Sequence, residues 1–291
     1  MKILLIDPPF KAFTGYANNF FPIGLAILAA ILKNEGHEVK VLEVDKITMT
    51  NDINYSDEYK RLRLYVDGIN DESHPVWAEI RKRLDDFRPD LIGITIMTQK
   101  FGSAIKTAEI CKKWNKNVPI VVGGPHATLD PDQTLQSGPI DYVVREEGED
   151  ILPKLVKALE EKRDFESVGS LSYIKNGRVV HNLAAPLIQN LDTVPFPARD
   201  LLMNPGNYSS EDMGVIMTAR GCPYKCTYCF HMLAKLLRVR STGNVIEEIK
   251  AVKEKYGTKQ FAFKDDTFTI NRKRLTELLD KMIDQKLNIN W

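Results

Sequence analysis

Short apolar runs alternate with amphipathic stretches through the first half of the chain. The runs Ile3–Ile6 and Leu91–Ile96 are apolar almost throughout, which is typical of strands buried on both faces. Residues 102–114 instead repeat apolar positions at helical spacing. The pattern predicts strands at 3–6, 39–43, 91–96, 120–122 and 142–144, with helices at 22–33, 76–87 and 102–114. This alternation predicts an α/β domain over residues 1–155, built as a doubly wound parallel sheet.

The pattern changes after that domain. Residues 171–181 alternate around Asn176-Gly177, which predicts a β-hairpin, and residues 191–200 are punctuated by Pro195 and Pro197. We therefore expect a linker with a hairpin over residues 156–210. Strand, helix, strand and helix follow at 213–218, 244–256, 260–263 and 272–286. Residues 211–291 thus read as the first βα units of a (β/α) barrel.

Composition excludes some function classes. The 291 residues are 43% hydrophobic and 27% charged, as in ordinary globular proteins. Forty basic residues against thirty-nine acidic ones give no electrostatic reason to expect a nucleic-acid partner. The N-terminus is apolar over only a few residues before Pro8-Pro9, so we expect neither a signal peptide nor a membrane span. We therefore expect a cytoplasmic protein.

Three of the four cysteines, Cys222, Cys226 and Cys229, fall within eight residues; this stretch is called the cysteine loop below. Thiolates are the preferred ligands of iron–sulfur clusters and zinc. A [4Fe-4S] cluster that only carries electrons takes four cysteines, so three would leave one iron open to another molecule. The fourth, Cys111, lies in a predicted helix and is expected to be a core residue.

The spacing C-x3-C-x2-C, with Tyr228 before the last cysteine and Arg220-Gly221 leading in, resembles the signature of the radical S-adenosylmethionine (SAM) enzymes. The resemblance implies that the open iron is chelated by the methionine part of SAM. It also implies reductive cleavage to a 5'-deoxyadenosyl radical, and contact of the Tyr228 region with adenine. A Cys3His zinc site using His231 is an alternative. A disulfide is disfavoured, because cytosolic thiols stay reduced.

Loops at the carboxyl ends of the predicted strands carry Thr95 and the pair Gly123-Gly124. Ligands of doubly wound sheets bind at these ends. Together with residues 92–98 and 141–149, these positions resemble the flavodoxin- or Rossmann-like cobalamin (B12)-binding domain that precedes some radical SAM cores. That resemblance implies that Thr95, Gly123 and Gly124 line the slot for the nucleotide tail. The first loop, from Asp7 to Tyr16, lacks the histidine that replaces the lower cobalt ligand in methionine-synthase-type domains.

An acidic turn, Asp265-Asp266, follows the second barrel strand, where the resemblance implies contact with the SAM amino group; a helix cap is the alternative. The chain ends at Trp291 on what would be a third strand, so we expect a C-terminally truncated member.

The resemblance implies methylation of an unactivated carbon in a small-molecule substrate, with electrons from a flavodoxin- or ferredoxin-type donor. An oxidative cyclase acting on a tetrapyrrole-like substrate is an alternative. A non-catalytic cobalamin-binding module and a zinc-stabilised two-domain protein also stay open.

Overall fold

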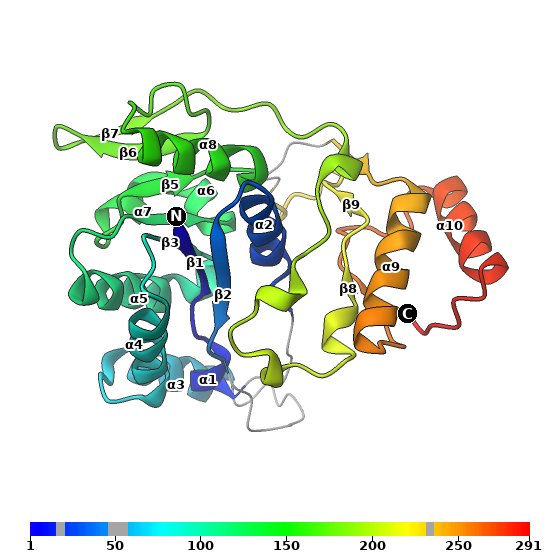
Figure 1. The fold of residues 1–291 in the computed structure, drawn as a ribbon, viewed down its shortest axis with the longest axis horizontal. Helices are drawn as coiled ribbons and strands as arrows, with labels where there is room; N and C mark the ends of the chain where they lie inside the picture. The colour runs from blue at the N-terminus through cyan, green and yellow to red at the C-terminus, as the bar shows by residue number, and fades with distance from the viewer. Residues whose placement is uncertain (16–20, 46–57, 231–235) are drawn as a thin grey trace.

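The computed structural model describes residues 1–15, 21–45, 58–230 and 236–291. Its main sheet has seven strands in the order β2-β1-β3-β4-β5-β6-β7 (Figure 1). The strands are β1 Lys2–Asp7, β2 Glu38–Glu43, β3 Leu91–Thr95, β4 Ile120–Gly123, β5 Tyr142–Val144, β6 Leu171–Lys175 and β7 Arg178–His181. β1 to β5 pair in parallel, and β6 and β7 add to them antiparallel. The predicted α/β class and the five predicted parallel strands are confirmed.

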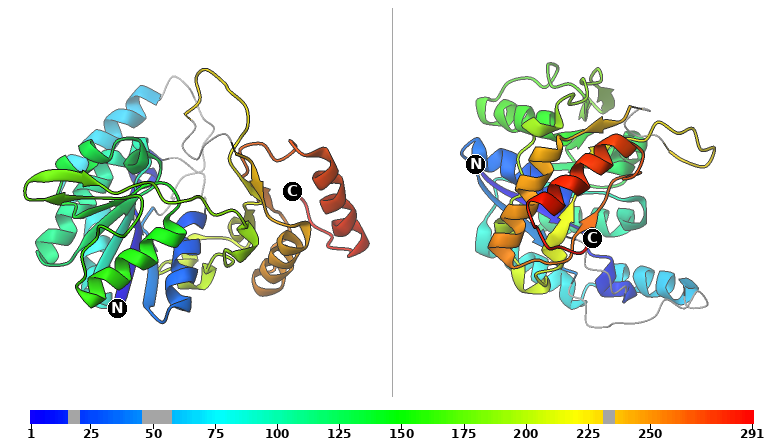
Figure 2. Two further views of the ribbon diagram at one scale, coloured as in Figure 1. Left: turned by 90° about the horizontal axis from the view of Figure 1, so that it is seen from above. Right: turned by 90° about the vertical axis from the view of Figure 1, so that its right-hand side faces the viewer.

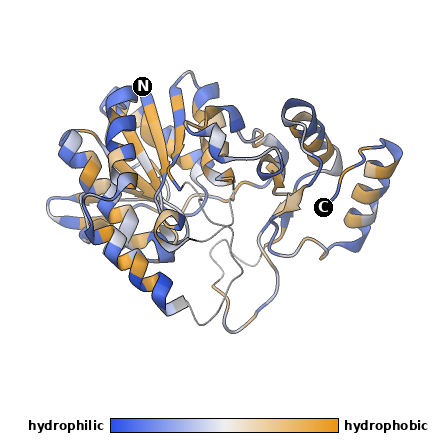
Figure 3. Cartoon of the chain, turned by 90° about the horizontal axis from the view of Figure 1, so that it is seen from below, coloured by the Kyte–Doolittle hydropathy of each residue, from blue (hydrophilic) through white to orange (hydrophobic). Residues whose placement is uncertain are grey.

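Helices cover both faces of this sheet. They are α1 Lys11–Thr14, α2 Ile23–Asn34, α3 Glu58–Asn70, α4 Pro75–Phe87, α5 Phe101–Trp114, α6 Pro125–Leu129, α7 Pro131–Gln136 and α8 Gly148–Glu161. Ile3 and Leu5 of β1 pack with α2 and α8, whereas Leu4 and Ile6 pack with α4 and α5. Successive side chains of a strand point to opposite faces, so a strand covered on both sides must be apolar at every position. Figure 3 shows this concentration of hydrophobic residues on the strands.

The hairpin β6–β7 differs from its expected place in a linker. Leu171, Ser172 and Tyr173 pair with the residues of β5, so the hairpin extends the sheet. Pairing between segments so far apart in sequence leaves no local trace in the pattern. The domain boundaries at 155 and 210 stay predictions.

The second half begins with a parallel pair, β8 Val215–Ile216 and β11 Ala262–Phe263, each followed by a helix, α9 Thr242–Tyr256 and α10 Arg272–Asp284. A second pair, β9 Ala219–Arg220 and β10 Arg238–Val239, is antiparallel and brackets the cysteine loop. The predicted βαβα order is therefore confirmed, with shorter strands than expected. Figure 2 shows α9 and α10 on the outer side of these strands.

The proline-punctuated segment folds back along the sheet. This segment contains the single-turn 3-10 helices Leu191–Thr193 and Arg199–Leu201, and Pro205–Asn207 and Asp212–Gly214 follow before β8. One more 3-10 helix, Thr98–Lys100, precedes α5. The Met203 amide donates to Val41 O at 2.8 Å, and the Ala198 amide to Ala26 O at 2.9 Å. Arg199 is buried and donates to Met213 O, Val215 O and the Glu248 carboxylate at 2.8–2.9 Å. One hydrophobic cluster consequently runs from β1 and α2 into β8, α9 and α10.

Among the described residues, no helix combines the length and the apolar character needed to cross a bilayer.

Candidate cofactor site between the sheet and the cysteine loop

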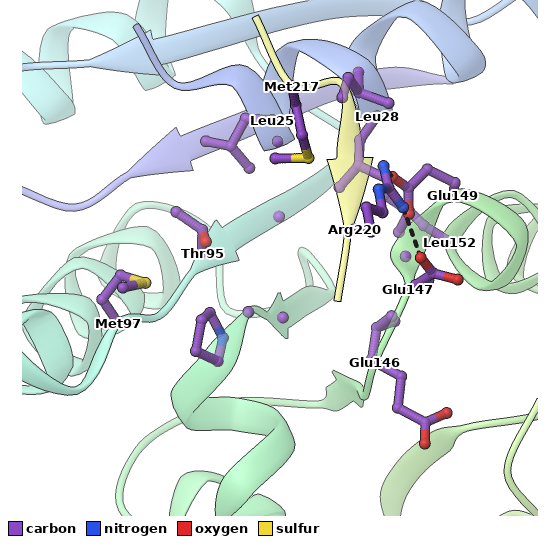
Figure 4. A pocket seen from close by; sticks show the side chains of 18 of the residues that line it. Leu25, Leu28, Thr95, Met97, Glu146, Glu147, Glu149, Leu152, Met217 and Arg220 are labelled. Carbon is purple, nitrogen blue, oxygen red and sulfur yellow. Dashed lines mark hydrogen bonds and ion pairs between the residues drawn. The ribbon is translucent and has the colours of Figure 1, made fainter. Parts of the chain in front are cut away.

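The carboxyl ends of β3, β4 and β5 open onto a cavity of about 650 Å³. Its opposite wall comes from the second half of the chain and includes Met217, Arg220, Cys222, Cys229 and Asp266. The apolar lining includes Leu25 and Leu28 of α2, Met97 after β3, and Leu152 of α8 (Figure 4). A volume of this size, with apolar walls and few polar groups, is typical of small-molecule and cofactor sites.

Thr95, Gly123 and Gly124, called the glycine edge below, all line this cavity as the sequence predicts. Gly124 has a φ of 106°, and a Cβ there would stand 3.0 Å from Thr95 Oγ1 and from Ile96 O. The edge is tied by bonds from the Ile96 amide to Gly123 O (2.7 Å) and from the His126 amide to Ile96 O (3.0 Å). Glycine is required here by the backbone itself, and it also leaves the cavity wall free of side chains.

Gly24 shows that the cavity extends onto α2. A Cβ built on Gly24 meets no atom within 4 Å, although this residue lines the cavity. Sequence reasoning missed Gly24, Leu25, Leu28, Met97 and Met217. A helical apolar pattern does not say which of its residues border a cavity.

The cysteine loop lies on the far side of the cavity. Cys222 and Cys229 line it. Cys226, Cys229 and Tyr228 are exposed, and Tyr228 is 91% exposed. The Cys222 thiol lies 3.8 Å from Thr267 Oγ1, and the Cys229 amide donates to Cys226 O at 3.1 Å. The hydrogen bond with Cys226 raises the pKa of Tyr228. Figure 2 shows the loop projecting from the body of the molecule.

The cysteine loop offers three thiols, the donors that iron–sulfur clusters prefer. In the described part of the chain, no three His, Cys, Asp or Glu side chains converge on a point where one ion could be held. A cluster spreads its thiolates over several irons, and three thiols on one short loop match that need. His231, the remaining ligand of the zinc alternative, falls outside the described residues.

The two aspartates after β11 have different environments. The Asp265 carboxylate accepts from the Thr218 amide at 2.6 Å, from the Ala219 amide at 3.1 Å and from Thr218 Oγ1. It therefore holds the strand that leads into the cysteine loop. Asp266, like Lys264, instead lines the cavity.

The first loop differs from cobalamin domains that use histidine. Asp7, at the end of β1, accepts from the Lys100 ammonium at 2.6 Å, and both side chains are largely buried. Burial raises the pKa of Asp7 although the charge of Lys100 opposes this. The ammonium group of Lys100 thus balances the charge of the Asp7 carboxylate in this loop.

Four charged side chains join the two halves, and three of them, Glu147, Glu149 and Arg220, line the cavity. Arg220 of β9 donates to Glu147 at 2.8 Å and to Glu149 (Figure 4). Arg238 of β10 donates to Glu147 at 2.7 Å. Below they are called the interdomain ion cluster.

Known proteins share both halves of this arrangement. Residues 13–156 match the B12 binding domain family. An uncharacterized methyltransferase of Pyrococcus horikoshii is 37% identical over 100% of this chain and 59% of its own length. The anaerobic magnesium-protoporphyrin IX monomethyl ester cyclase of Rubrivivax gelatinosus is 29% identical over 100% of this chain and 50% of its own. This chain therefore spans about half the length of these relatives.

The structure of the radical SAM methyltransferase TsrM from Kitasatospora setae superposes with a TM-score of 0.73, at 19% identity, over 98% of this chain and 51% of that one. The fold and site define a two-part α/β protein in which a sheet edge faces a cysteine loop across one cavity. Together with the sequence matches, this places residues 13–156 in the B12 binding domain family, and the whole chain shares its fold with a radical SAM methyltransferase.

Proposed function

We propose that this chain binds cobalamin at the glycine edge and a [4Fe-4S] cluster on the cysteine loop, and serves SAM-dependent methylation of an unactivated carbon in a small molecule. The observation that carries the proposal is the shared cavity. Thr95, Gly123 and Gly124 line one wall, and Cys222 and Cys229 line the wall opposite. Two cofactors can act on one substrate only when their sites open onto a common space.

The chain's residues fit the three groups as follows. The glycine edge leaves room for a bulky ligand, since Gly123 and Gly124 line the cavity without any side chain of their own. Cys222, Cys226 and Cys229 would hold the cluster. Asp266 would accept from the SAM amino group, and Tyr228 would lie near adenine once the loop closes. When bound, the cluster supplies an electron for cleavage of SAM, and cobalamin supplies a methyl group.

The apolar walls also have a role in this proposal. Leu25, Leu28, Leu152 and Met217 would exclude water from the space between the cofactors. Exclusion of water protects reactive species from side reactions. Electrons would come from an external donor of flavodoxin or ferredoxin type.

A second candidate is oxidative ring formation on a tetrapyrrole-like substrate. It is favoured by the 29% identity to the Rubrivivax gelatinosus cyclase over the whole of this chain. The cofactor residues would be the same in both cases, so product analysis with the two substrate classes distinguishes the candidates. A binding protein without catalysis would hold the cofactors and give neither product.

The test is anaerobic reconstitution followed by iron, sulfide and zinc analysis and low-temperature EPR, with and without SAM. We expect about four irons and four sulfides per chain and a reduced spectrum that changes when SAM is added. Cys229→Ala should lose this cluster, whereas Cys111→Ala should keep it, because Cys111 is a buried core residue whose pKa burial raises to about 12. Zinc without sulfide, or a cluster whose spectrum ignores SAM, would refute the proposal.

A further inference from the structure

The interdomain ion cluster connects one carboxylate of the sheet domain to both strands that bracket the cysteine loop. Glu147 Oε1 accepts from Arg220 at 2.8 Å, and Glu147 Oε2 accepts from Arg238 at 2.7 Å. Arg220 and Arg238 are direct partners in the β9–β10 pair. The two oxygens of Glu147 therefore hold the two strands at the positions where the loop leaves and returns.

The cluster is buried and its charges balance. The side chains of Glu147 and Arg238 are 5% and 3% exposed, and those of Glu149 and Arg220 are 11% and 12% exposed. Burial alone would raise the pKa of Glu147, but hydrogen bonds from Arg238 and Arg220 hold it below its usual range. Two arginines face two glutamates, so removing one member leaves an uncompensated charge away from water.

The backbone of Ile188, in the segment after β7, also contacts Glu147 and Arg238. Glu147 Oε2 accepts from the Ile188 amide at 2.8 Å, and Arg238 donates to Ile188 O at 2.8 Å. Glu147 and Glu149 flank Gly148 at the start of α8, and all three line the cavity. The carboxylate thus belongs to the same sheet end as the glycine edge.

Arg220 stands two residues before Cys222, and Arg220, Gly221 and Cys222 all line the cavity. Any movement of β9 away from Glu147 would move the first cluster ligand away from the glycine edge. Bidentate pairing by arginine restricts such movement more than a single-point lysine contact does.

We propose that Glu147, with Arg220 and Arg238, is a positioning residue that sets the distance between the cysteine loop and the glycine edge. This rests on the proposed function, since the distance matters because two cofactors share the cavity. Loss of Glu147 is therefore expected to change this distance in the folded protein with both cofactors bound, in addition to any effect on stability.

The test compares wild type with Glu147→Gln, which keeps the shape of the side chain and removes its charge. The matched control is Asp150→Asn in the same turn of α8, whose carboxylate pairs with Lys154 in an exposed i,i+4 contact. Each protein is loaded with cobalamin and cluster, reduced, and examined by EPR for dipolar coupling between cob(II)alamin and the reduced cluster. Iron, sulfide and cobalamin content are measured in parallel.

We expect one well-defined coupling in wild type and Asp150→Asn, and a weakened or broadened coupling in Glu147→Gln at equal cofactor content. An unchanged coupling in Glu147→Gln would overturn the proposal. Should this variant fail to fold, Arg220→Lys takes its place, because lysine keeps one contact and cannot bridge Glu147 and Glu149. An unchanged coupling there would overturn the proposal equally.

A second readout needs no cofactor. Amide hydrogen exchange across residues 221–230 should be faster in Glu147→Gln than in wild type, while exchange across α5 stays unchanged. Equal exchange in the loop would contradict the positioning role. If wild type itself bound neither cofactor, the proposed function would fail, and this measurement would still decide whether Glu147 holds the loop.

Discussion

The glycine edge and the cysteine loop face each other across one cavity, and the fold supports them to different degrees. Thr95, Gly123 and Gly124 end buried strands and are tied by main-chain hydrogen bonds. Cys226 and Cys229 are exposed, and Tyr228 next to them is 91% exposed. The sheet therefore holds the glycine edge in place, whereas the cysteine loop is anchored only at its ends, and under the proposed function it would take its final shape around a cluster. Metal binding commonly supplies such folding energy.

The largest change in stability is expected at Glu248, whose buried ion pairs hold the second half of the chain in place. Glu248, 1% exposed, pairs with the buried Arg199 at 2.9 Å and with Arg240 at 2.5 Å. Glu248→Ala should lower the free energy of unfolding by about 3–5 kcal/mol, because it leaves buried arginines uncompensated. Chemical denaturation measures this. Glu247→Ala on the same helix removes an exposed pair with Lys250 and should change stability by less than about 0.5 kcal/mol. Equal effects of the two variants on the free energy of unfolding would contradict this stabilising role of Glu248.

The next test concerns the sheet side. Burial and the charge of Asp45 raise the pKa of Glu43 to about 7, although Lys11 and the Tyr208 hydroxyl oppose this shift. The folded state therefore holds a proton that the unfolded state releases near its ordinary pKa of 4.5. The contribution of Glu43 is fully present below about pH 4.5 and is lost as the pH rises to about 7.

Glu43→Gln mimics the protonated acid and removes this dependence. The variant should match wild type near pH 5 and exceed its free energy of unfolding by up to about 3 kcal/mol at pH 8. Denaturation at the two pH values measures the difference. A variant that is less stable than wild type at pH 8 would show that Glu43 functions as a stabilising anion.

The smallest expected change in stability lies in the cysteine loop. Because Cys226 is exposed, Cys226→Ala should alter the free energy of unfolding of the metal-free protein by no more than about 0.5 kcal/mol. It should still abolish iron retention. Thermal unfolding and iron analysis of the same preparation give both values. A large loss of stability without metal would mean that the loop is already part of the folded core.

The same contrast explains what the sequence could predict. The buried parallel strands β1 and β3 have unbroken apolar runs, Ile3–Ile6 and Leu91–Ile94, and a cysteine spacing is visible in the sequence. Helix α3 was not predicted, since its surface-exposed Leu62, Leu64 and Val66 blur the amphipathic pattern. Helix α8 was also missed, where Pro153 lies inside the helix. The different environments of Asp265 and Asp266 could not be predicted, because adjacent identical residues are distinguished only by what they contact.

The central claim is that cobalamin occupies the cavity beside the glycine edge, and Gly24 offers the most direct test. Gly24 and Gly243 both occupy the second position of a helix, and a Cβ at either meets nothing within 4 Å, but only Gly24 lines the cavity. Equilibrium dialysis with hydroxocobalamin should give one bound molecule per chain for wild type and Gly243→Phe, and little or none for Gly24→Phe. Equal binding by Gly24→Phe, or no binding by wild type, would contradict the account.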